Sequence, residues 1–412
     1  MFPIHETNRR LLCRVIFLVL VPAPTLAVAA WCGARHLPGH TAAYEDRLSA
    51  ALGVRVEIDV VTHPLPGKTV LHGVKLFDAE QGAEIASCDE LSITNSEETL
   101  LITADQATIK RKHFGHGWEA LHARLRRPDM LPAKTRIIVG SLRVDVSYGY
   151  ETLERVDLNI RSYRSGVVQL RLAFGLFDMV SDEPIRVEID RNRQAAPPAT
   201  HIVLRTGPTA LPCSLLSLTG DGLSALGPKS RFRGVASIQQ TSDGWQCRIT
   251  GECTKIDLKR LVTEQFPPHE LSGLANIRIE STDPEKWGAE LINGRIVRAD
   301  GFITAKEGRV GGSLIGALEQ HLNIPPVYPK QFPAQDFEWL RAAFTLNEEG
   351  LSIRGPTRGG GSVIVDESNR PLLGQVRSPQ PLAGLLNALL PEKEPAARAY
   401  LEAILPRPAL LR

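Results

Sequence analysis

The chain has 412 residues, of which 43% are apolar and 23% are charged, a composition typical of folded proteins and not of disordered ones. This length exceeds what one compact hydrophobic core usually serves, so the sequence predicts either two domains or one elongated sheet. A net charge of +2 and an aromatic content of 6% provide little basic or stacking surface, and we expect no nucleic-acid partner.

An uncharged apolar segment lies near the N-terminus, between Val15 and Trp31. Its length approaches the ~20 residues that a helix needs to cross a bilayer. Arg9, Arg10 and Arg14 precede it and few basic residues follow it, so the positive-inside rule predicts a cytoplasmic N-terminus and an exported body. We assign residues 1–40 to a cytoplasmic stub and a membrane anchor. The expected anchor residues are Val15, Ile16, Phe17, Leu18, Val19, Leu20 and Trp31.

A cleaved signal peptide is the alternative interpretation of this segment. Ala27, Val28 and Ala29 form the small-x-small pattern of a processing site. Both interpretations place the residues after 40 outside the cytoplasm.

The pattern after the anchor changes from helical to extended. Residues 41–52 have helical spacing and end at Gly53, a common helix stop. Residues 54–60 then alternate between apolar and charged side chains, which predicts a strand with one apolar face. The turn-forming residues 64–67 lead into a second strand over 69–76.

The same alternation returns along most of the chain, for example over 142–146, 156–160, 168–172 and 185–190. Short connections between these segments predict antiparallel pairing. The positions that we expect to line one apolar face are Val54, Val56, Ile58, Val60, Leu142, Val144, Val146, Leu158 and Leu170. The expected fold is mainly β: an N-terminal transmembrane helix followed by an elongated, curved antiparallel sheet, built as a groove or a sandwich.

Helical patterns are few, at 256–265, at 313–322 and in a C-terminal hairpin over 381–405. They are too few to cover the apolar face, so the sheet must fold back on itself as a filled sandwich or leave a groove for an apolar ligand. Residues 194–200 contain two prolines and are either a domain boundary or a hairpin loop. We divide the body there, into an N-terminal β region (41–195) and a C-terminal β region with a helical tail (196–412).

The order of these segments resembles AsmA-like proteins of the bacterial envelope. After the anchor, the resemblance lies in YEDRLSAALGVRVEIDVV and THPLPGKTVLHGVKLFDAEQGAEIASCDELSI. Near the C-terminus it lies in FTLNEEGLSIRGPTRGGGSVIVDESNRPLLG, whereas the middle of the chain shares only the strand rhythm.

The resemblance implies a single-pass protein of the bacterial inner membrane with its bulk in the periplasm. Its β-groove would contact the acyl chains of membrane lipids, in lipid transport or outer-membrane assembly, with other envelope assembly proteins as candidate partners. The alternative is a structural or scaffolding envelope protein with a filled β-core and no enzymatic activity.

The sequence offers no convincing constellation for catalysis. His113, His116 and His122 lie in one basic stretch, but Glu119 is the only carboxylate close to them, so we interpret the stretch as an exposed loop. The glycine run at 359–361 lacks the Gly-Lys-Ser/Thr ending of a phosphate loop. We expect no enzyme, no metal site and no cofactor.

Two of the six cysteines, Cys247 and Cys253, are close in sequence. They would face each other across a tight hairpin and form a disulfide in an oxidising compartment, or stay free and buried.

Overall fold

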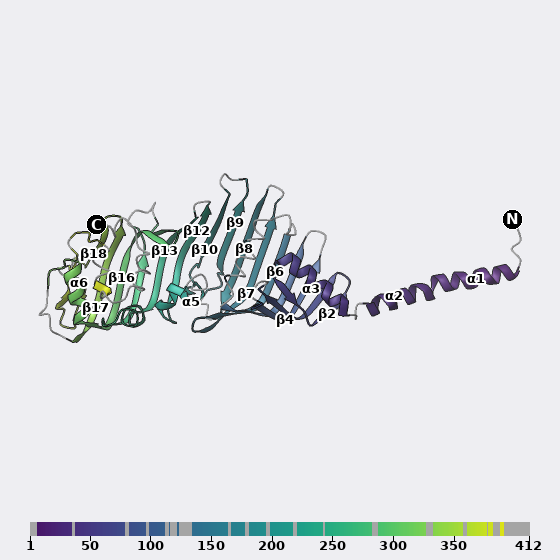
Figure 1. Ribbon diagram of the computed structural model, residues 1–412, viewed down its shortest axis with the longest axis horizontal. Helices are drawn as coiled ribbons and strands as arrows, with labels where there is room; N and C mark the ends of the chain where they lie inside the picture. Colours follow the sequence, from purple (N-terminus) through teal and green to yellow (C-terminus); the bar gives the residue numbers. More distant parts are fainter. Residues whose placement is uncertain are drawn as a thin grey trace.

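The computed structural model describes residues 6–34, 38–78, 82–95, 99–111, 115, 122, 134–163, 166–177, 181–194, 198–216, 221–241, 244–281, 287–326, 333–356, 361–376, 378–381 and 388–390. The described part is mainly β, with an apolar helical segment at the N-terminus, a single large sheet and a few short helices, as the sequence predicts (Figure 1).

The helices are α1 (Glu6–Leu20), α2 (Pro22–Ala34), α3 (Pro38–Leu52), α5 (Cys213–Leu216) and α6 (Gly312–His321), with a short 3₁₀-helix η4 (Asp221–Leu226) and a single π-helical turn η5 (Lys259–Thr263). The first ten strands are β1 (Arg55–Glu57), β2 (Val60–Leu65), β3 (Lys68–Phe77), β4 (Glu84–Asn95), β5 (Leu100–Ile109), β6 (Lys134–Val146), β7 (Gly149–Ser162), β8 (Val167–Leu176), β9 (Ile185–Asn192) and β10 (Ala199–Arg205). The remaining strands are β11 (Leu211–Pro212), β12 (Arg231–Thr241), β13 (Gly244–Asp257), β14 (Leu271–Ile279), β15 (Ala289–Ile292), β16 (Arg295–Gly311), β17 (Ala334–Asn347), β18 (Gly350–Arg354), β19 (Ile364–Val365) and β20 (Pro371–Leu373).

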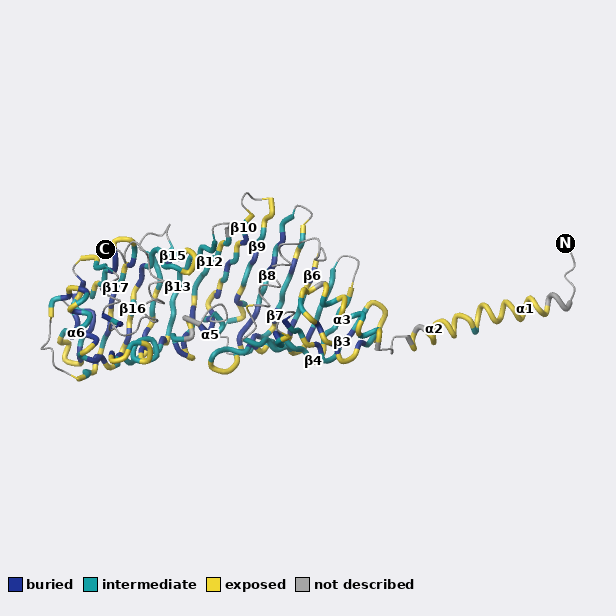
Figure 2. Tube along the Cα trace, viewed as in Figure 1, coloured by how far each residue is buried: buried dark blue, intermediate teal, exposed yellow. Residues whose placement is uncertain are grey.

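The α1–α2 segment is long and apolar enough to cross a membrane. Its apolar stretch runs over Arg10–Ala30, 21 residues with a mean hydropathy of 2.3 and no side-chain burial against the rest of the chain. Pro22 removes one backbone donor, and the break between the two helices falls at Val21. The Thr25 hydroxyl donates a 2.8 Å hydrogen bond to the Val21 carbonyl, which satisfies that acceptor beside the break. Figure 2 shows the described side chains of both helices as mostly exposed.

Within the described residues the sheet has twenty strands, which follow one another across it nearly in chain order. The pairings among these strands are antiparallel except β5–β6, which is parallel. Four strand pairs (β1–β2, β10–β11, β14–β15 and β18–β19) each lie end to end along one neighbouring strand. The twenty strands therefore occupy sixteen places across the sheet. With neighbouring places ~4.8 Å apart, the sheet is on the order of 75 Å long.

The sheet bends along a line that crosses β3 to β7. Gly140 lies on this line in β6, where an added Cβ would come within 2.9 Å of the Asp105 carbonyl oxygen, and Arg155 lies beside it in β7 with a φ of 51°. Val139 and Val144 flank the line at positions that regular alternation would send to opposite faces, yet both pack in one interior cluster. The irregularity at Gly140 therefore resets the alternation and curves the sheet toward its apolar face.

Helix α3 closes the N-terminal edge of the sheet. The outward-facing amides of the edge strand donate to its side chains: Val56 N–H to Ser49 Oγ (2.9 Å) and Ile58 N–H to Glu45 Oε1 (2.8 Å). The apolar side chains Tyr44 and Leu48 of the same helix pack on the first interior cluster. α3 thus covers an edge that would otherwise invite pairing with another chain.

The C-terminal end of the sheet is closed by the largest interior cluster. Leu314, Ile315 and Leu322 from α6 and its end pack against Phe337 of β17 and Leu372 of β20, all of them buried. Figure 1 shows α6 at the end of the sheet opposite the N-terminal helices. This part of the protein has a filled core.

The structure differs from one helical prediction and bears on two other segments. The pattern at 256–265 does not form a regular helix, because Ile256 still belongs to β13 and only a single turn, η5, follows. Strands β9 and β10 pair with each other directly, so residues 194–200 connect neighbouring strands of the one sheet. The C-terminal hairpin over 381–405 lies outside the described residues, apart from 381 and 388–390.

The edge cap provides the first test. Replacing Glu45 and Ser49 together by alanine removes both acceptors. We expect the free energy of unfolding, measured by urea denaturation, to fall by about 1–3 kcal/mol. The double variant should also associate with increasing concentration in size-exclusion chromatography, because the strand edge is uncovered. Asp46→Ala, at an exposed position of the same helix, is the control. Equal behaviour of the double variant and the control would contradict the capping role.

Candidate functional site: the apolar face of the sheet

One apolar face continues across the sheet from strand to strand. Its course follows from the register, in which directly paired residues point to the same side. Between β10 and β15, Ile202 pairs with Ile238, Ile238 with Cys247, and Cys247 with Leu291. Farther along, Ile277 of β14 pairs with an isoleucine of β16 on the same side. The face therefore connects the N-terminal clusters with the C-terminal core.

The expected residues at the N-terminal end of the face lie beneath α3. Val56 and Ile58 are buried, with exposed fractions of 3% and 5%, and Val54 packs beside them. Val60 is the exception, since its side chain is 50% exposed while the next residue, Val61, is buried. The predicted strand breaks after Ile58, where the Asp59 amide donates to the His72 carbonyl, and β2 starts with the opposite alternation. Assigning Val60 to the apolar face was wrong.

The expected residues on β6, β7 and β8 lie in two neighbouring clusters. Val144 is 3% exposed, and Leu142 and Val146 pack against the same cluster. Leu170 is 2% exposed in the next cluster, with Leu158 against it. The structure thus brings Leu142, Val144 and Val146 together, and Leu158 with Leu170, in packed interior surroundings.

A central strip of the apolar face is less deeply buried than either end. We define the central strip as Ile238, Cys247, Ile249, Leu291 and Ile296, all half-buried on β12, β13, β15 and β16. Burial raises the pKa of the Cys247 thiol to about 11, so this cysteine is neutral at pH 7 in apolar surroundings. None of its five residues belongs to the described interior clusters, so the central strip has apolar surface left to contact a ligand.

The connection between the parallel strands β5 and β6 reaches the apolar face at His122. This residue is buried, and its Nε2 lies 3.5 Å from the Thr200 hydroxyl of β10. Its ring centroid lies 6.3 Å from that of Trp245 on β13. His122 was expected in an exposed loop, and that expectation was wrong, because the crossover carries it over strands far from its own. His113, His116 and Glu119 lie outside the described residues.

The opposite, outer face of the sheet is polar. Arg136 pairs with Asp157 at 2.7 Å, and Arg171 pairs with Asp190 at 3.1 Å. The Arg136 guanidinium donates two hydrogen bonds to the Asp157 carboxylate, and these bonds raise the pKa of Arg136. Such exposed pairs add little stability, but they keep this side of the sheet in water. A sheet with one wet and one apolar side directs any apolar ligand to a single face.

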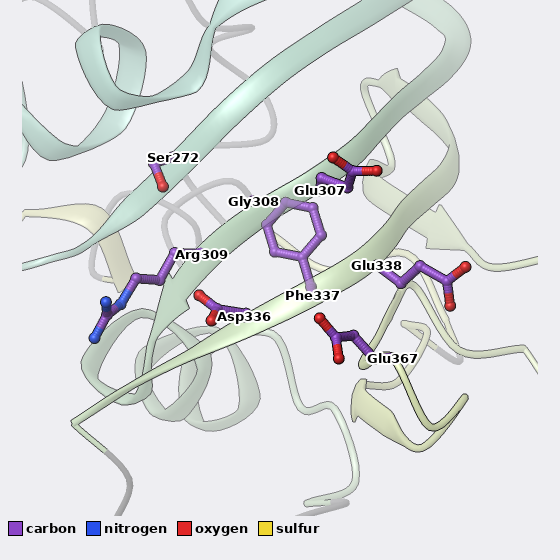
Figure 3. A pocket seen from close by; sticks show the side chains of 8 residues that line it. All are labelled: Ser272, Glu307, Gly308, Arg309, Asp336, Phe337, Glu338 and Glu367. Atoms are coloured by element: carbon purple, nitrogen blue, oxygen red, sulfur yellow. The ribbon is translucent and has the colours of Figure 1, made fainter.

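A depression with a volume of about 710 Å³ lies beside β16 and β17 (Figure 3). Glu307, Asp336, Glu338 and Glu367 line it together with Arg309. In Figure 3 the four carboxylates spread around the Phe337 ring and do not converge on one point. Among the described residues no three metal-ligating side chains gather in one place. The depression gives no geometric basis for a metal or catalytic site.

Six of the seven expected anchor residues lie on the exposed surface of α1. Val15, Ile16, Phe17, Leu18, Val19 and Leu20 all belong to α1 and are between 46% and 68% exposed. Trp31 belongs to α2. A helix with apolar side chains on every side suits a surrounding of lipid.

Sequence reasoning missed the features that cross the face. The burial of His122 and the packing of α5 join residues that are far apart in the chain, and no local pattern signals them. Comparison with family models, curated proteins and solved structures finds no significant match to this chain.

The opposite placement of Val56 and Val60 provides a second test. Val56→Thr buries a hydroxyl among apolar side chains and should lower the free energy of unfolding by about 1–3 kcal/mol. Val60→Thr should change it by less than about 0.5 kcal/mol, because that side chain faces solvent. Urea unfolding followed by circular dichroism measures both. Similar losses for the two variants would show that the alternation does not reset after Ile58.

Proposed function

We propose that this protein is a single-pass, AsmA-like protein of the bacterial cell envelope, whose apolar face contacts lipid acyl chains in lipid transport or outer-membrane assembly. The observation that carries the proposal is the continuous, one-sided apolar face on a sheet that follows a helix able to cross a membrane. An apolar surface of this length needs a covering, and an acyl chain is an apolar ligand with a matching elongated shape.

The central strip is the proposed contact site, because the two ends of the face are filled. α3 packs on the first cluster and α6 on the last. A sheet on the order of 75 Å with closed ends suits a protein that holds a chain or presents it to a partner. It suits an open conduit between two membranes less well.

A structural or scaffolding role is the second candidate. The filled C-terminal core and the near-complete burial of Val56, Ile58, Val144 and Leu170 favour it. In this version the central strip is covered by the protein itself, and the sheet serves as a stiff spacer attached to the membrane.

The proposed topology predicts where a reporter becomes active. Alkaline phosphatase needs periplasmic disulfides for activity, so its fusion after residue 40 should be active and a fusion after residue 9 inactive. Sequencing the N-terminus of the active fusion distinguishes a retained anchor from cleavage after Ala29. An inactive fusion after residue 40 would place the body in the cytoplasm and end the envelope assignment.

The lipid contact is tested by a photo-crosslinking amino acid placed in the full chain within living cells. At Ile249, on the central strip, we expect phospholipid adducts detected by mass spectrometry. The matched control is Ile292, an isoleucine 43% exposed at the far end of β15, whose paired residue Gln246 is on the outer face. Crosslinks from Ile249 only to other residues of the chain would favour the scaffolding role. Equal lipid adducts at both positions would contradict a one-sided contact.

A further inference from the structure

Cys213 and Cys253 meet inside the protein, although forty positions separate them in the chain. Cys213 is 1% exposed at the start of α5, two positions after Leu211, and Leu211 pairs with Phe232, which pairs with Cys253 of β13. The Cys213 amide donates to the Ser230 carbonyl at 3.0 Å, beside the start of β12. The strand register and this hydrogen bond place Cys213 close to Cys253, and each thiol, free in the structure, shifts the pKa of the other.

The strand geometry excludes the disulfide alternative for Cys247 and Cys253. Cys247 and Cys253 both belong to β13, six positions apart on one extended strand, a separation of roughly 20 Å. A disulfide requires Cα atoms within about 7 Å of each other. The idea of a Cys247–Cys253 hairpin disulfide was wrong, and Cys213 takes the place of Cys247.

The segment 211–216, which we call the brace, crosses the apolar face between two parts of the sheet. On one side, Leu211 pairs with Phe232 of β12. On the other side, the Ser214 hydroxyl donates a 3.0 Å hydrogen bond to Glu151 of β7, and Leu215 packs on the cluster that contains Val144. Strands β8, β9 and β10 lie between these two attachments.

We propose that Cys213 and Cys253 form a disulfide that fixes the brace to β13 and sets the curvature of the apolar face. The oxidant is a disulfide-carrying donor, such as oxidised glutathione or a dithiol oxidoreductase. The thiolate of one cysteine attacks one donor sulfur and releases the other donor sulfur as a thiol. The thiolate of the second cysteine then attacks the sulfur of the first and releases the second donor thiol. Two electrons and two protons pass from the cysteine pair to the donor.

The position of Cys213 sets the time of the reaction. Because it is almost fully buried in the folded chain, the donor reaches it only before the brace closes. The disulfide then forms during folding and resists reductants afterwards.

Peptide mapping of the full chain, purified in detergent from cells treated with N-ethylmaleimide, tests the proposal. Trypsin releases Cys213 in residues 206–229, Cys247 in 234–248 and Cys253 in 249–255, so the three thiols are read separately. We expect 206–229 linked to 249–255, in wild type and in Cys247→Ser. N-ethylmaleimide on both Cys213 and Cys253 of the wild type, or a link from either to Cys247, would overturn it.

Refolding separates this proposal from the assignment of the compartment. Reduced full-length protein refolded from urea with oxidised glutathione should form the same link, whichever compartment the body occupies in cells. It should melt about 5 °C higher than the protein refolded without oxidant. Cys213→Ser and Cys253→Ser should lose this difference, and Cys247→Ser should keep it. Refolded wild type without the link would overturn the disulfide even if lipid contact at Ile249 is found.

Discussion

The structure depends on one constraint: a long sheet with an apolar side must keep that side away from water along its whole length. The outer face carries ion pairs such as Arg136–Asp157 and Arg171–Asp190 and needs no cover. The apolar face has a different cover in each region: α3 at the N-terminal end, the brace in the first half and α6 at the C-terminal end. Each cover is short, so the curvature of the sheet must do the rest.

Curvature is built into the strands and does not come from the covers alone. At Gly140 and Arg155 the alternation resets, so both Val139 and Val144 reach the same interior. The same kind of reset after Ile58 turns Val60 outward and Val61 inward. A regular strand would have left half of these side chains on the wet side. The irregular residues are therefore as necessary to the apolar face as the apolar residues themselves.

This explains how much the sequence could predict. Period-two alternation identifies the strands, and helical spacing identifies α3 and α6, because both patterns are local. A reset within a strand, as at Asp59, is invisible when the residues around it keep an apolar pattern. The contact of Cys213 with Cys253, the position of His122 beside Thr200, and the parallel β5–β6 pair depend on the final curvature. Local sequence patterns do not predict that curvature.

The uneven depth of the face bears on what the protein does. Where a cover is present, as over Val56 and Val144, the side chains are almost completely buried. No ligand is needed there to keep apolar surface away from water. Along the central strip, Ile238, Ile249 and Leu291 keep part of their apolar surface accessible. Leaving apolar surface accessible has a cost, which binding of an apolar chain would offset and a purely structural sheet would not require. What covers the central strip therefore distinguishes lipid contact from scaffolding, and the length of the sheet does not.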